Sequence, residues 1–365
     1  MRARARAGWR WRALTALLPV TTLVVTACAT NTAQTTVEQG ALPQDALSPV
    51  GRFAIQTDEL WNLVLWVAIV IFVFVEALIV VAILRFRERP DDGDRLPKQI
   101  HGNPRLEAIW TVIPALILAG VAVPTVRVLF DLADEPEGNN VLSVDVIGHQ
   151  WWWEYQYPQF EGLETANILH IPTDQTVVLK ATSDDVIHSF WVPKLAGKQD
   201  TVPGRESLIK LYADEPGEYL GQCAEFCGLS HANMRLRVIA HEPADFQRWA
   251  QQQARSIRLD RLSGQAARGR DAFVEGACVG CHSIRGLEGA SGTVGPDLTY
   301  FSDRGWFAGA IFENTDESLR DWLADPPKMK PMEPGDGRGM PDLNLSDQEI
   351  DALVAFLREL KTPDQ

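Results

Sequence analysis

Soft metal ligands are concentrated in one short segment of the sequence. It contains Cys223 and Cys227, then His231 four positions later and Met234 three positions beyond that. Thiolate, imidazole and thioether ligands together suit copper better than calcium or magnesium, which prefer oxygen. A further imidazole lies upstream, where His188 is expected at the end of an apolar strand. These residues predict a copper site that draws one ligand from a separate strand.

Two other interpretations use the same residues. Two cysteines and two histidines are enough for a tetrahedral zinc site. Zinc does not need Met234, however, and the spacing of the cysteines differs from that of a zinc knuckle. A disulfide between Cys223 and Cys227 is the second alternative. From the residues alone copper is favoured, and both alternatives stay open.

The second pair of cysteines belongs to a different kind of site. Cys278 and Cys281 are followed at once by His282, which completes the Cys-x-x-Cys-His pattern of c-type haem attachment. The two sulfurs would form thioether bonds to the porphyrin, and the adjacent imidazole would bind the iron. The sequence therefore predicts a covalently bound haem c.

The second axial ligand of this haem is expected to be a methionine, as in cytochromes c. The candidates are Met329, Met332 and Met340. Met340 precedes a proline and a predicted amphipathic helix at residues 345–357, with Ser346 as its N-cap. In small c-type cytochromes the ligand lies in such a loop before the terminal helix. We therefore predict Met340 as the ligand and the other two as loop or rim residues.

The N-terminal segment is typical of an exported protein. Five arginines precede a short apolar stretch that ends in Val-Val-Thr-Ala-Cys28, which resembles a bacterial lipoprotein signal. Residues 1–28 are expected to be a signal peptide with Cys28 as the lipidated first residue of the mature chain. An ordinary signal with an incidental cysteine is the alternative. Residues 29–52 are expected to form a flexible tether.

Two later apolar segments are long enough to cross a membrane. They cover residues 61–84 and about 108–129, and a bilayer core of about 30 Å needs ~20 apolar helical residues. The connection between them is rich in arginine and lysine, which places it in the cytoplasm by the positive-inside rule. We expect residues 53–130 to form a transmembrane hairpin in the bacterial inner membrane, with all later residues on the periplasmic face.

The remaining residues predict two soluble domains. Residues 131–242 are expected to be all-β, a small antiparallel sandwich or barrel, because short runs of strand-forming residues alternate with turn signals. The predicted strands are residues 141–147, 176–181, 207–212, 219–223 and 235–240. A polar linker at residues 243–263 then leads to an all-α domain at residues 264–365.

The charge of the chain argues against a nucleic-acid partner. The formal net charge is −14, and residues 264–365 contain 18 acidic and 10 basic side chains. An acidic surface favours a basic protein partner instead.

With these motifs established, residues 53–242 resemble cytochrome c oxidase subunit II. Residues 101–114 resemble the start of the second helix of that family, and residues 148–155 resemble its aromatic segment. Residues 223–234 match the copper motif of the family at every ligand position. The fold class implied is a two-helix transmembrane hairpin followed by an all-β cupredoxin domain.

Residues 264–362 resemble an all-α class I cytochrome c domain. Gly295-Pro296-Asp-Leu298 resembles the loop that packs on the haem-ligating histidine in that family. The order of lipid anchor, hairpin, copper domain and cytochrome c domain resembles subunit II of caa-type haem–copper oxidases.

The resemblance implies a dinuclear, mixed-valence copper centre, CuA. Its ligands would be the bridging thiolates of Cys223 and Cys227, the imidazoles of His188 and His231, the thioether of Met234 and the backbone carbonyl of Glu225. The Glu225 carboxylate would also help to hold a magnesium ion shared with subunit I.

Two further roles follow from the resemblance. Trp151 matches the position that accepts electrons from cytochrome c, and Glu107 matches the mouth of a proton route into subunit I. The alternative for residues 151–153 is packing between the β domain and the membrane surface. The alternative for Glu107 is a carboxylate placed at a helix start by the helix dipole.

The function implied is that of the electron-accepting subunit of cytochrome c oxidase, a component of a proton-translocating oxidoreductase. Electrons would pass from a donor, either cytochrome c or a quinol-oxidising complex, through haem c and CuA to the oxygen-reducing site of subunit I. Subunits I and III would be its partners in the membrane. The alternatives are the electron-accepting subunit of a CuA-containing nitric oxide reductase and a membrane-tethered electron carrier.

Overall fold

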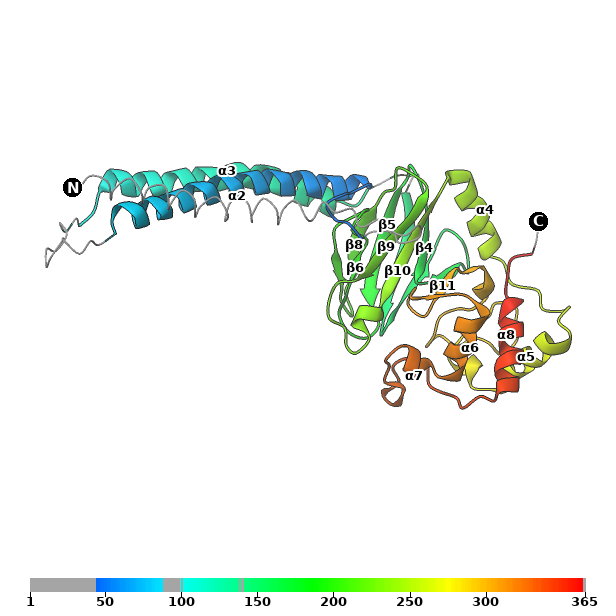
Figure 1. Ribbon diagram of the computed structural model, residues 1–365. Helices are drawn as coiled ribbons and strands as arrows, with labels where there is room; N and C mark the ends of the chain where they lie inside the picture. The colour runs from blue at the N-terminus through cyan, green and yellow to red at the C-terminus, as the bar shows by residue number, and fades with distance from the viewer. Residues whose placement is uncertain (1–43, 88–98, 100, 137, 139–140, 364–365) are drawn as a thin grey trace, which may run out of the picture. The chain divides into compact units, whose positions relative to one another are not determined.

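The computed structural model describes residues 44–87, 99, 101–136, 138 and 141–363. The predicted signal peptide, the predicted lipidation at Cys28 and most of the predicted tether lie outside the described residues. A helical hairpin, a β-sandwich and a helical domain follow one another along the described chain (Figure 1).

The hairpin consists of α2 (Arg52–Arg85) and α3 (Pro104–Ala133), which run side by side (Figure 1). Large apolar side chains such as Phe72 and Leu118 are exposed along both helices. A lipid environment explains this exposure, and both helices are long and apolar enough to cross a membrane. Both extend beyond the predicted spans because their ends continue through more polar turns.

The β-sandwich has two five-stranded sheets. The strand orders are β3-β2-β1-β5-β8 and β4-β10-β9-β6-β7. The first sheet contains β1 (Val141–His149), β2 (Trp152–Gln156), β3 (Glu164–Ala166), β5 (Thr176–Ser183) and β8 (Ser207–Leu211). The second contains β4 (Ile168–Pro172), β6 (His188–Trp191), β7 (Gln199–Thr201), β9 (Gly217–Cys223) and β10 (Arg235–His241).

All five predicted strands are present, but the prediction of a purely antiparallel arrangement is wrong. Strand β1 pairs with β5 in parallel, and β4 pairs with β10 in parallel. In each case the chain passes through the opposite sheet before it returns, so the second strand runs in the same direction as the first.

The core of the sandwich lies between the sheets. Side chains of β1 alternate between partly buried and buried, and Val144 and Val146 are fully enclosed. In the neighbouring strand Tyr155 pairs with Val146, and Trp153 pairs with Gly148. This register brings large aromatic side chains into the core beside Gly148, which lies against His188.

Helix α4 (Pro243–Gln253) occupies the first half of the predicted linker. Its Phe246 is buried against the sandwich core, and the Trp249 ring stacks on His170 at 4.0 Å. His170 in turn hydrogen-bonds to His241 at 2.8 Å between ring nitrogens. The segment is therefore a packed helix in its first half, which its polar composition did not indicate.

The C-terminal domain is built from α5 (Gly264–Glu275), α6 (Asp316–Ala324), α7 (Pro326–Met329) and α8 (Asp347–Arg358). It also contains short 3₁₀ turns and a small hairpin, β11 (Trp306–Phe307) and β12 (Phe312–Glu313). The predicted Ser346 cap is confirmed, since its hydroxyl accepts from Glu349 N while the Glu349 carboxylate accepts from Ser346 N.

Helices α5 and α8 cross at very short range. At Gly269 of α5 an added Cβ would overlap the carbonyl oxygen of Ala352 in α8. Only a residue without a side chain allows this approach. The crossing places the N- and C-terminal helices of the domain against each other around the core residues Phe273 and Phe356, whose rings lie 5.7 Å apart.

A lysine connects the hairpin to the sandwich. Lys210 of β8 donates from Nζ to the backbone carbonyl oxygens of Asp131 and Asp134, at the C-terminal end of α3. Its ammonium group also lies 5.2 Å from the centre of the Phe53 ring, at the start of α2. One side chain thus contacts both helices of the hairpin where they meet the β domain.

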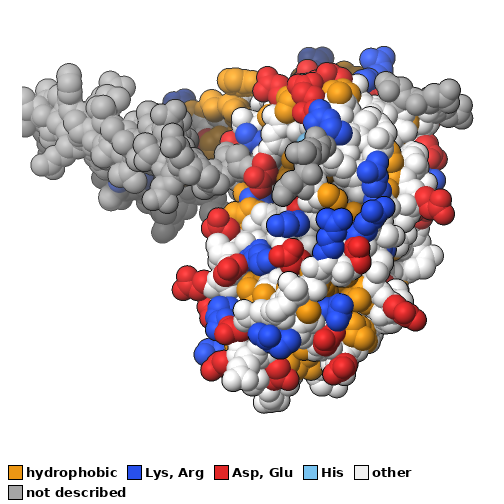
Figure 2. All heavy atoms as spheres, turned by 90° about the vertical axis from the view of Figure 1, so that its right-hand side faces the viewer, with side chains coloured by type: hydrophobic (Ala, Val, Ile, Leu, Met, Phe, Trp, Pro, Cys, Tyr) orange, Lys and Arg blue, Asp and Glu red, His pale blue; other side chains and the backbone are white. Residues whose placement is uncertain are grey.

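Charged side chains of both signs share the face shown in Figure 2. Basic and acidic side chains are mixed over most of this face, and a group of acidic side chains lies at its upper edge in the view. Over most of this face the acidic balance of the C-terminal domain is therefore spread among basic groups.

Candidate functional site

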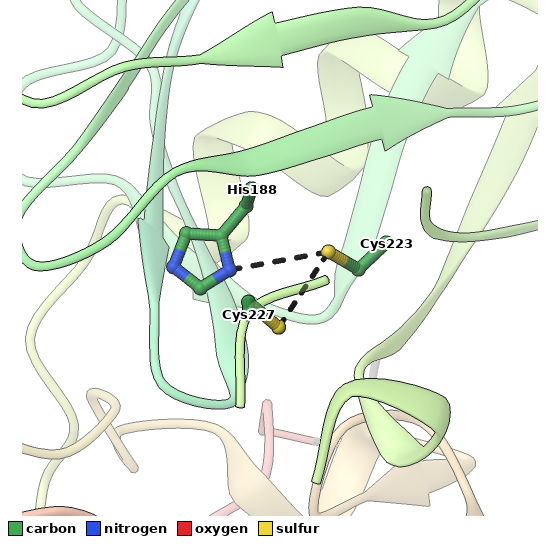
Figure 3. Close-up of side chains that lie close together, drawn as sticks. All are labelled: His188, Cys223 and Cys227. Atoms are coloured by element: carbon green, nitrogen blue, oxygen red, sulfur yellow. Dashed lines mark hydrogen bonds between the residues drawn. The ribbon is translucent and has the colours of Figure 1, made fainter. Parts of the chain in front are cut away.

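Three of the predicted metal ligands lie on adjacent strands. His188 begins β6 and Cys223 ends β9, and these strands pair antiparallel. Nδ1 of His188 lies 3.9 Å from Sγ of Cys223, and the sulfurs of Cys223 and Cys227 are 3.7 Å apart (Figure 3). All three side chains are buried.

The other predicted donors converge on the same point. Nδ1 of His231 lies 3.6 Å from Sγ of Cys227, and Sδ of Met234 lies 3.8 Å from it. The backbone oxygen of Glu225 is 3.2 Å from Sγ of Cys223. The structure therefore brings all six groups predicted from the sequence into one cluster.

The donor set fits two copper ions better than the alternatives. The sulfurs are free thiols 3.7 Å apart, whereas a disulfide bond is about 2.05 Å long. A tetrahedral zinc ion takes four ligands, which would leave two of the converging donors unused. Two sulfurs flanked by a donor set on each side suit a pair of soft metal ions that share both thiolates.

The protonation of the two thiols supports this fit. The hydrogen bond between the two sulfurs lowers the pKa of Cys223 to about 4, and the same contact raises the pKa of Cys227. The contact therefore favours the thiolate form of Cys223 over that of Cys227. Positive ions bound to the sulfurs would hold both cysteines as thiolates.

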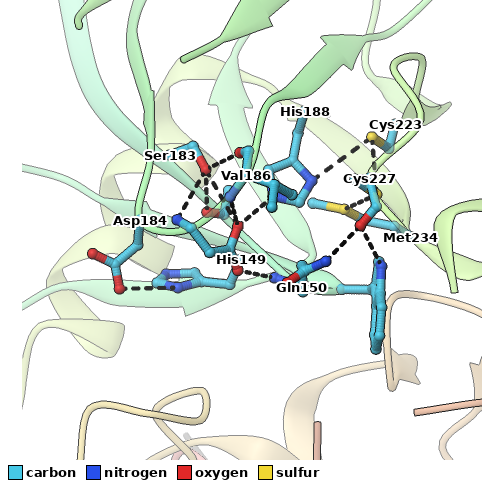
Figure 4. Close-up of polar contacts among 12 residues, drawn as sticks. His149, Gln150, Ser183, Asp184, Val186, His188, Cys223, Cys227 and Met234 are labelled. Carbon is cyan, nitrogen blue, oxygen red and sulfur yellow. Dashed lines mark hydrogen bonds and ion pairs between the residues drawn. The ribbon is translucent and has the colours of Figure 1, made fainter. Parts of the chain in front are cut away.

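A second layer of contacts fixes His188. Its Nε2 lies 2.8 Å from Oδ1 of Asp185, and the other oxygen of this carboxylate accepts from Gln150 N at 2.6 Å. Figure 4 shows His188 between this polar network and the sulfur cluster. An added Cβ on Gly148 would approach the imidazole to 2.8 Å, so glycine is required there. No local sequence pattern marks Asp185 as a partner of the ligand His188.

Trp151 lies directly behind the copper loop. Its indole Nε1 donates to the backbone oxygen of Cys227 at 3.0 Å, and Gln150 Nε2 donates to the same oxygen at 2.7 Å. Only 2% of the Trp151 surface is exposed. Trp153 is also buried, with its ring edge-on to His188 at 5.9 Å between centroids. Both side chains belong to the core of the β domain.

The haem motif lines a cavity of about 590 Å³. Cys278, Cys281 and His282 form part of its wall. Nδ1 of His282 lies 2.9 Å from the Pro296 oxygen, which can only accept, so the other ring nitrogen carries no proton. An added Cβ on Gly295 would approach the imidazole to 2.6 Å. The residues present fit a haem bound through two cysteines and one histidine.

The three candidate methionines lie in different positions, and two of them border the haem cavity. Met340 lines the haem cavity, and its Sδ accepts a hydrogen bond from Trp322 Nε1 at 3.2 Å. Met332 also lines this cavity but packs partly against the core of the β domain. Met329 borders a separate hollow.

The wall of the haem cavity includes residues from the β domain. Trp151 and Trp152 both line it, together with His149, whose ring stacks on Trp152 at 4.3 Å. The cavity that fits the haem and the loop that carries the copper ligands therefore share Trp151.

Comparisons with known proteins agree with this architecture. The family model for the transmembrane domain of cytochrome c oxidase subunit II matches residues 36–128, and the model for its periplasmic domain matches residues 159–241. The cytochrome c model matches residues 266–361.

Curated relatives match along most of the chain. Cytochrome c oxidase subunit 2 of Alkalihalophilus pseudofirmus is 37% identical over 360 residues, which cover 96% of this chain and 98% of that protein. The chain belongs to the cytochrome c oxidase subunit II family. The subunits 2 of Bacillus sp. strain PS3 and Bacillus subtilis are 35% and 33% identical, covering 76% and 86% of this chain and 80% and 91% of theirs.

Membership establishes the general function. The chain is the electron-accepting subunit of a haem–copper oxidase, an oxidoreductase component with CuA and haem c as its cofactors. It is a membrane protein whose copper and haem domains are periplasmic, and it works as one subunit of an oxidase complex. The nitric oxide reductase subunit and the independent tethered carrier are not favoured.

Proposed function

We propose that electrons pass from haem c to CuA within this chain, by way of Trp151. The observation that carries the proposal is the shared position of this side chain. Trp151 lines the cavity that contains the haem motif, and its indole N–H donates to the carbonyl of the copper ligand Cys227. Trp151 therefore borders the proposed haem site on one side and is hydrogen-bonded to a copper ligand on the other.

The residues of the chain hold the two cofactors in fixed positions. When bound, haem c and CuA supply reversible one-electron chemistry. Cys278 and Cys281 would hold the haem through thioether bonds, and His282 and Met340 would bind its iron. The proposed CuA ligands are His188, Cys223, the Glu225 carbonyl, Cys227, His231 and Met234. The distances between donors, all below 4 Å where they are given above, support this assignment.

The experiment is Trp151→Phe in the complete oxidase. Phenylalanine keeps an aromatic ring but removes the donor to the Cys227 carbonyl. We expect haem-to-CuA electron transfer, followed by flash photolysis, to slow, because the variant loses the hydrogen bond that links the Trp151 side chain to the copper ligand Cys227. Both cofactor spectra should persist.

The matched control is Trp249→Phe on α4, where the indole stacks on His170 away from both cofactor sites. This variant should transfer electrons at the wild-type rate. An unchanged rate in Trp151→Phe, with both cofactors present, would remove Trp151 from the route.

We further propose that the copper end of the β domain docks on subunit I. Apolar side chains are exposed on both ligand-bearing segments there: Val186, Ile187, Phe226 and Leu229. Exposed apolar groups of this kind mark interaction surfaces.

Glu225, exposed on the same loop, would help to hold the shared magnesium ion. When manganese replaces this magnesium ion in the oxidase, the EPR signal of the bound manganese should be lost in Glu225→Gln.

The proposed role of Glu107 is at the mouth of a proton route. The carboxylate lies in the first turn of α3, where Oε1 accepts from Asn103 N at 3.1 Å. A helix-capping role uses the same contact, so the two interpretations need separate readouts. Glu107→Gln should slow proton uptake by the oxidase while the helical content stays unchanged. Unchanged proton uptake would leave only the capping role.

The electron donor is proposed to be a basic protein, either a cytochrome c or part of a quinol-oxidising complex. The C-terminal domain has an excess of acidic over basic side chains, which would attract such a donor. Membership of the family also implies coupling to proton translocation and contact with subunit III. Steady-state rates with the donor should fall as salt rises. A rate that is independent of salt would count against an electrostatic partner.

A further inference from the structure

The C-terminal domain contacts the β domain through a small number of specific interactions. The backbone N–H of Arg235 donates to the Gly309 oxygen at 3.1 Å. The guanidinium group of Arg237 lies 3.6 Å from the centre of the Trp306 ring. An added Cβ on Gly309 would approach the Asn233 oxygen to 2.6 Å, so the two backbones touch at this point.

Lys330 is the buried charged residue of this contact. It follows α7, and only 2% of its surface is exposed. Its Nζ donates to the Trp151 oxygen at 2.7 Å and to the Ala308 oxygen at 3.0 Å. The ammonium group thus links the backbone carbonyl of Trp151 to the loop that contains Ala308 and Gly309, and Gly309 contacts Arg235.

Burying the ammonium group of Lys330 is energetically unfavourable, so its position indicates a specific structural role. Among the ion pairs of the described residues, none involves Lys330, so its partners here are two backbone carbonyls. Desolvation lowers the pKa of this lysine to about 7, an effect that the nearby Cys227 opposes. A methionine of similar length would fill the same space without the cost of burying an ammonium group. What methionine would lack is the hydrogen bond across the domain boundary.

We propose that Lys330 is a positioning residue that holds the haem domain in register against Trp151. The inference rests on the proposed electron route and names the group that keeps its two halves together. By binding the Trp151 and Ala308 carbonyls at once, Lys330 fixes the haem cavity against the Trp151 side chain and the nearby Arg235–Gly309 hydrogen bond. The electron step it supports is a single transfer, in which haem c loses one electron and CuA gains it, with no bond made or broken.

The test is Lys330→Met in the complete oxidase, with Lys328→Met as the matched control. Lys328 is exposed on the same segment, two residues away. The first readout is hydrogen exchange at the Arg235 amide, which reports the interdomain hydrogen bond without any electron transfer. The second is the rate of haem-to-CuA transfer after flash photolysis, with the spectrum and potential of each cofactor recorded beside it.

In Lys330→Met we expect Arg235 exchange to accelerate by about tenfold or more, as for buried carbonyls that lose their hydrogen-bond donor. Electron transfer should slow at least as much, with both cofactor spectra unchanged. Lys328→Met should resemble the wild type in both readouts. If the Met variant does not assemble, Gly309→Ala disturbs the same contact and should give the same two changes.

Two results would overturn the inference. One is unchanged exchange at Arg235 together with unchanged transfer. The other is a shifted haem potential or spectrum with unchanged exchange, because Lys330 would then serve the haem itself. Failure of the proposed electron route would give a different result. Fast Arg235 exchange in Lys330→Met, together with a wild-type rate of haem-to-CuA transfer in Trp151→Phe, would support the positioning role of Lys330 and exclude Trp151 from the electron route.

Discussion

The two ring nitrogens of His188 have different partners. Nδ1 faces the sulfur of Cys223, and Nε2 faces the carboxylate of Asp185. A metal-bound imidazole commonly donates its second N–H to a carboxylate, which fixes the ring and raises its basicity as a ligand. Burial acts to lower the pKa of His188, but the hydrogen bonds to Asp185 and Cys223 outweigh it and raise the value. Asp185 therefore holds the ring in the orientation that copper needs.

This arrangement predicts the effect of Asp185→Asn. The amide cannot supply a full negative charge to the imidazole, so copper affinity should fall by about 10- to 100-fold. Competition with a copper chelator, followed by the EPR signal of CuA, measures the change. The control is Asp184→Asn, whose carboxylate is 78% exposed and 3.8 Å from His149. Equal copper retention in both variants would contradict the supporting role of Asp185.

Among single residues, the sequence predicts the metal ligands better than the residues that hold the ligands and domains in position. Cys223, Cys227, His231 and Met234 lie within twelve consecutive residues, and their side chains are soft donors, so type and spacing identify them. Asp185 and Lys330 are ordinary charged residues in sequence. Their roles arise from contacts made across strands and across a domain boundary, which no local pattern encodes.

Among the elements, the crossing of α5 and α8 depends on a single glycine. In an open helix alanine is more stable than glycine by about 0.5–1 kcal/mol. At Gly269 the sign should reverse, because the added methyl group would overlap the Ala352 carbonyl and force the helices apart.

We expect Gly269→Ala to lower the free energy of unfolding of the haem domain by about 1–3 kcal/mol, the usual range for overpacking. Guanidinium unfolding of the full chain, followed by haem absorbance, measures this loss. Gly305→Ala is the control, because an added Cβ there meets no atom within 4 Å. A stabilised Gly269→Ala variant would show that the two helices adjust without strain.

The elements that were predicted from sequence have strong local signals. The strand at residues 141–147 alternates apolar and polar side chains, and the last helix begins at Ser346 with a capping box. Helix α4 and the strands β2, β3, β4 and β7 were not predicted. Helix α4 is mostly polar and is stabilised by Phe246 and Trp249 against the sandwich, while three-residue strands are too short to show a period.

On the scale of the whole molecule, Lys210 joins the membrane hairpin to the periplasmic domains. The last carbonyls of a helix have no partner within the helix, and a cation there is also favoured by the helix dipole. Lys210 supplies both interactions to α3 and is itself only 9% exposed. The orientation of the β domain on its membrane anchor thus depends on a buried side chain.

Lys210→Met should loosen this junction. Removing the ammonium group takes away its hydrogen bonds to the carbonyls of Asp131 and Asp134, and a hydrogen bond of a charged group contributes about 1.5–3 kcal/mol. Hydrogen exchange in the last turn of α3, measured in the oxidase in detergent, should accelerate by at least about tenfold. Lys198→Met, at an exposed site, should leave the exchange unchanged. Equal protection in both variants would mean that the hairpin is held by its apolar contacts alone.

The exposed apolar side chains beside the copper ligands bear on how long the metal stays bound. Phe226 is 76% exposed and Leu229 56% exposed, although Cys227 between them is buried. An unassembled subunit would present this loop to water, where the loop can open and release its ions, while a partner pressed against it would slow that opening. Residence time would then be set by assembly, not by the ligands alone. CuA should survive a chelator markedly longer in the oxidase than in the free subunit, and equal half-lives would place all of the protection within this one chain.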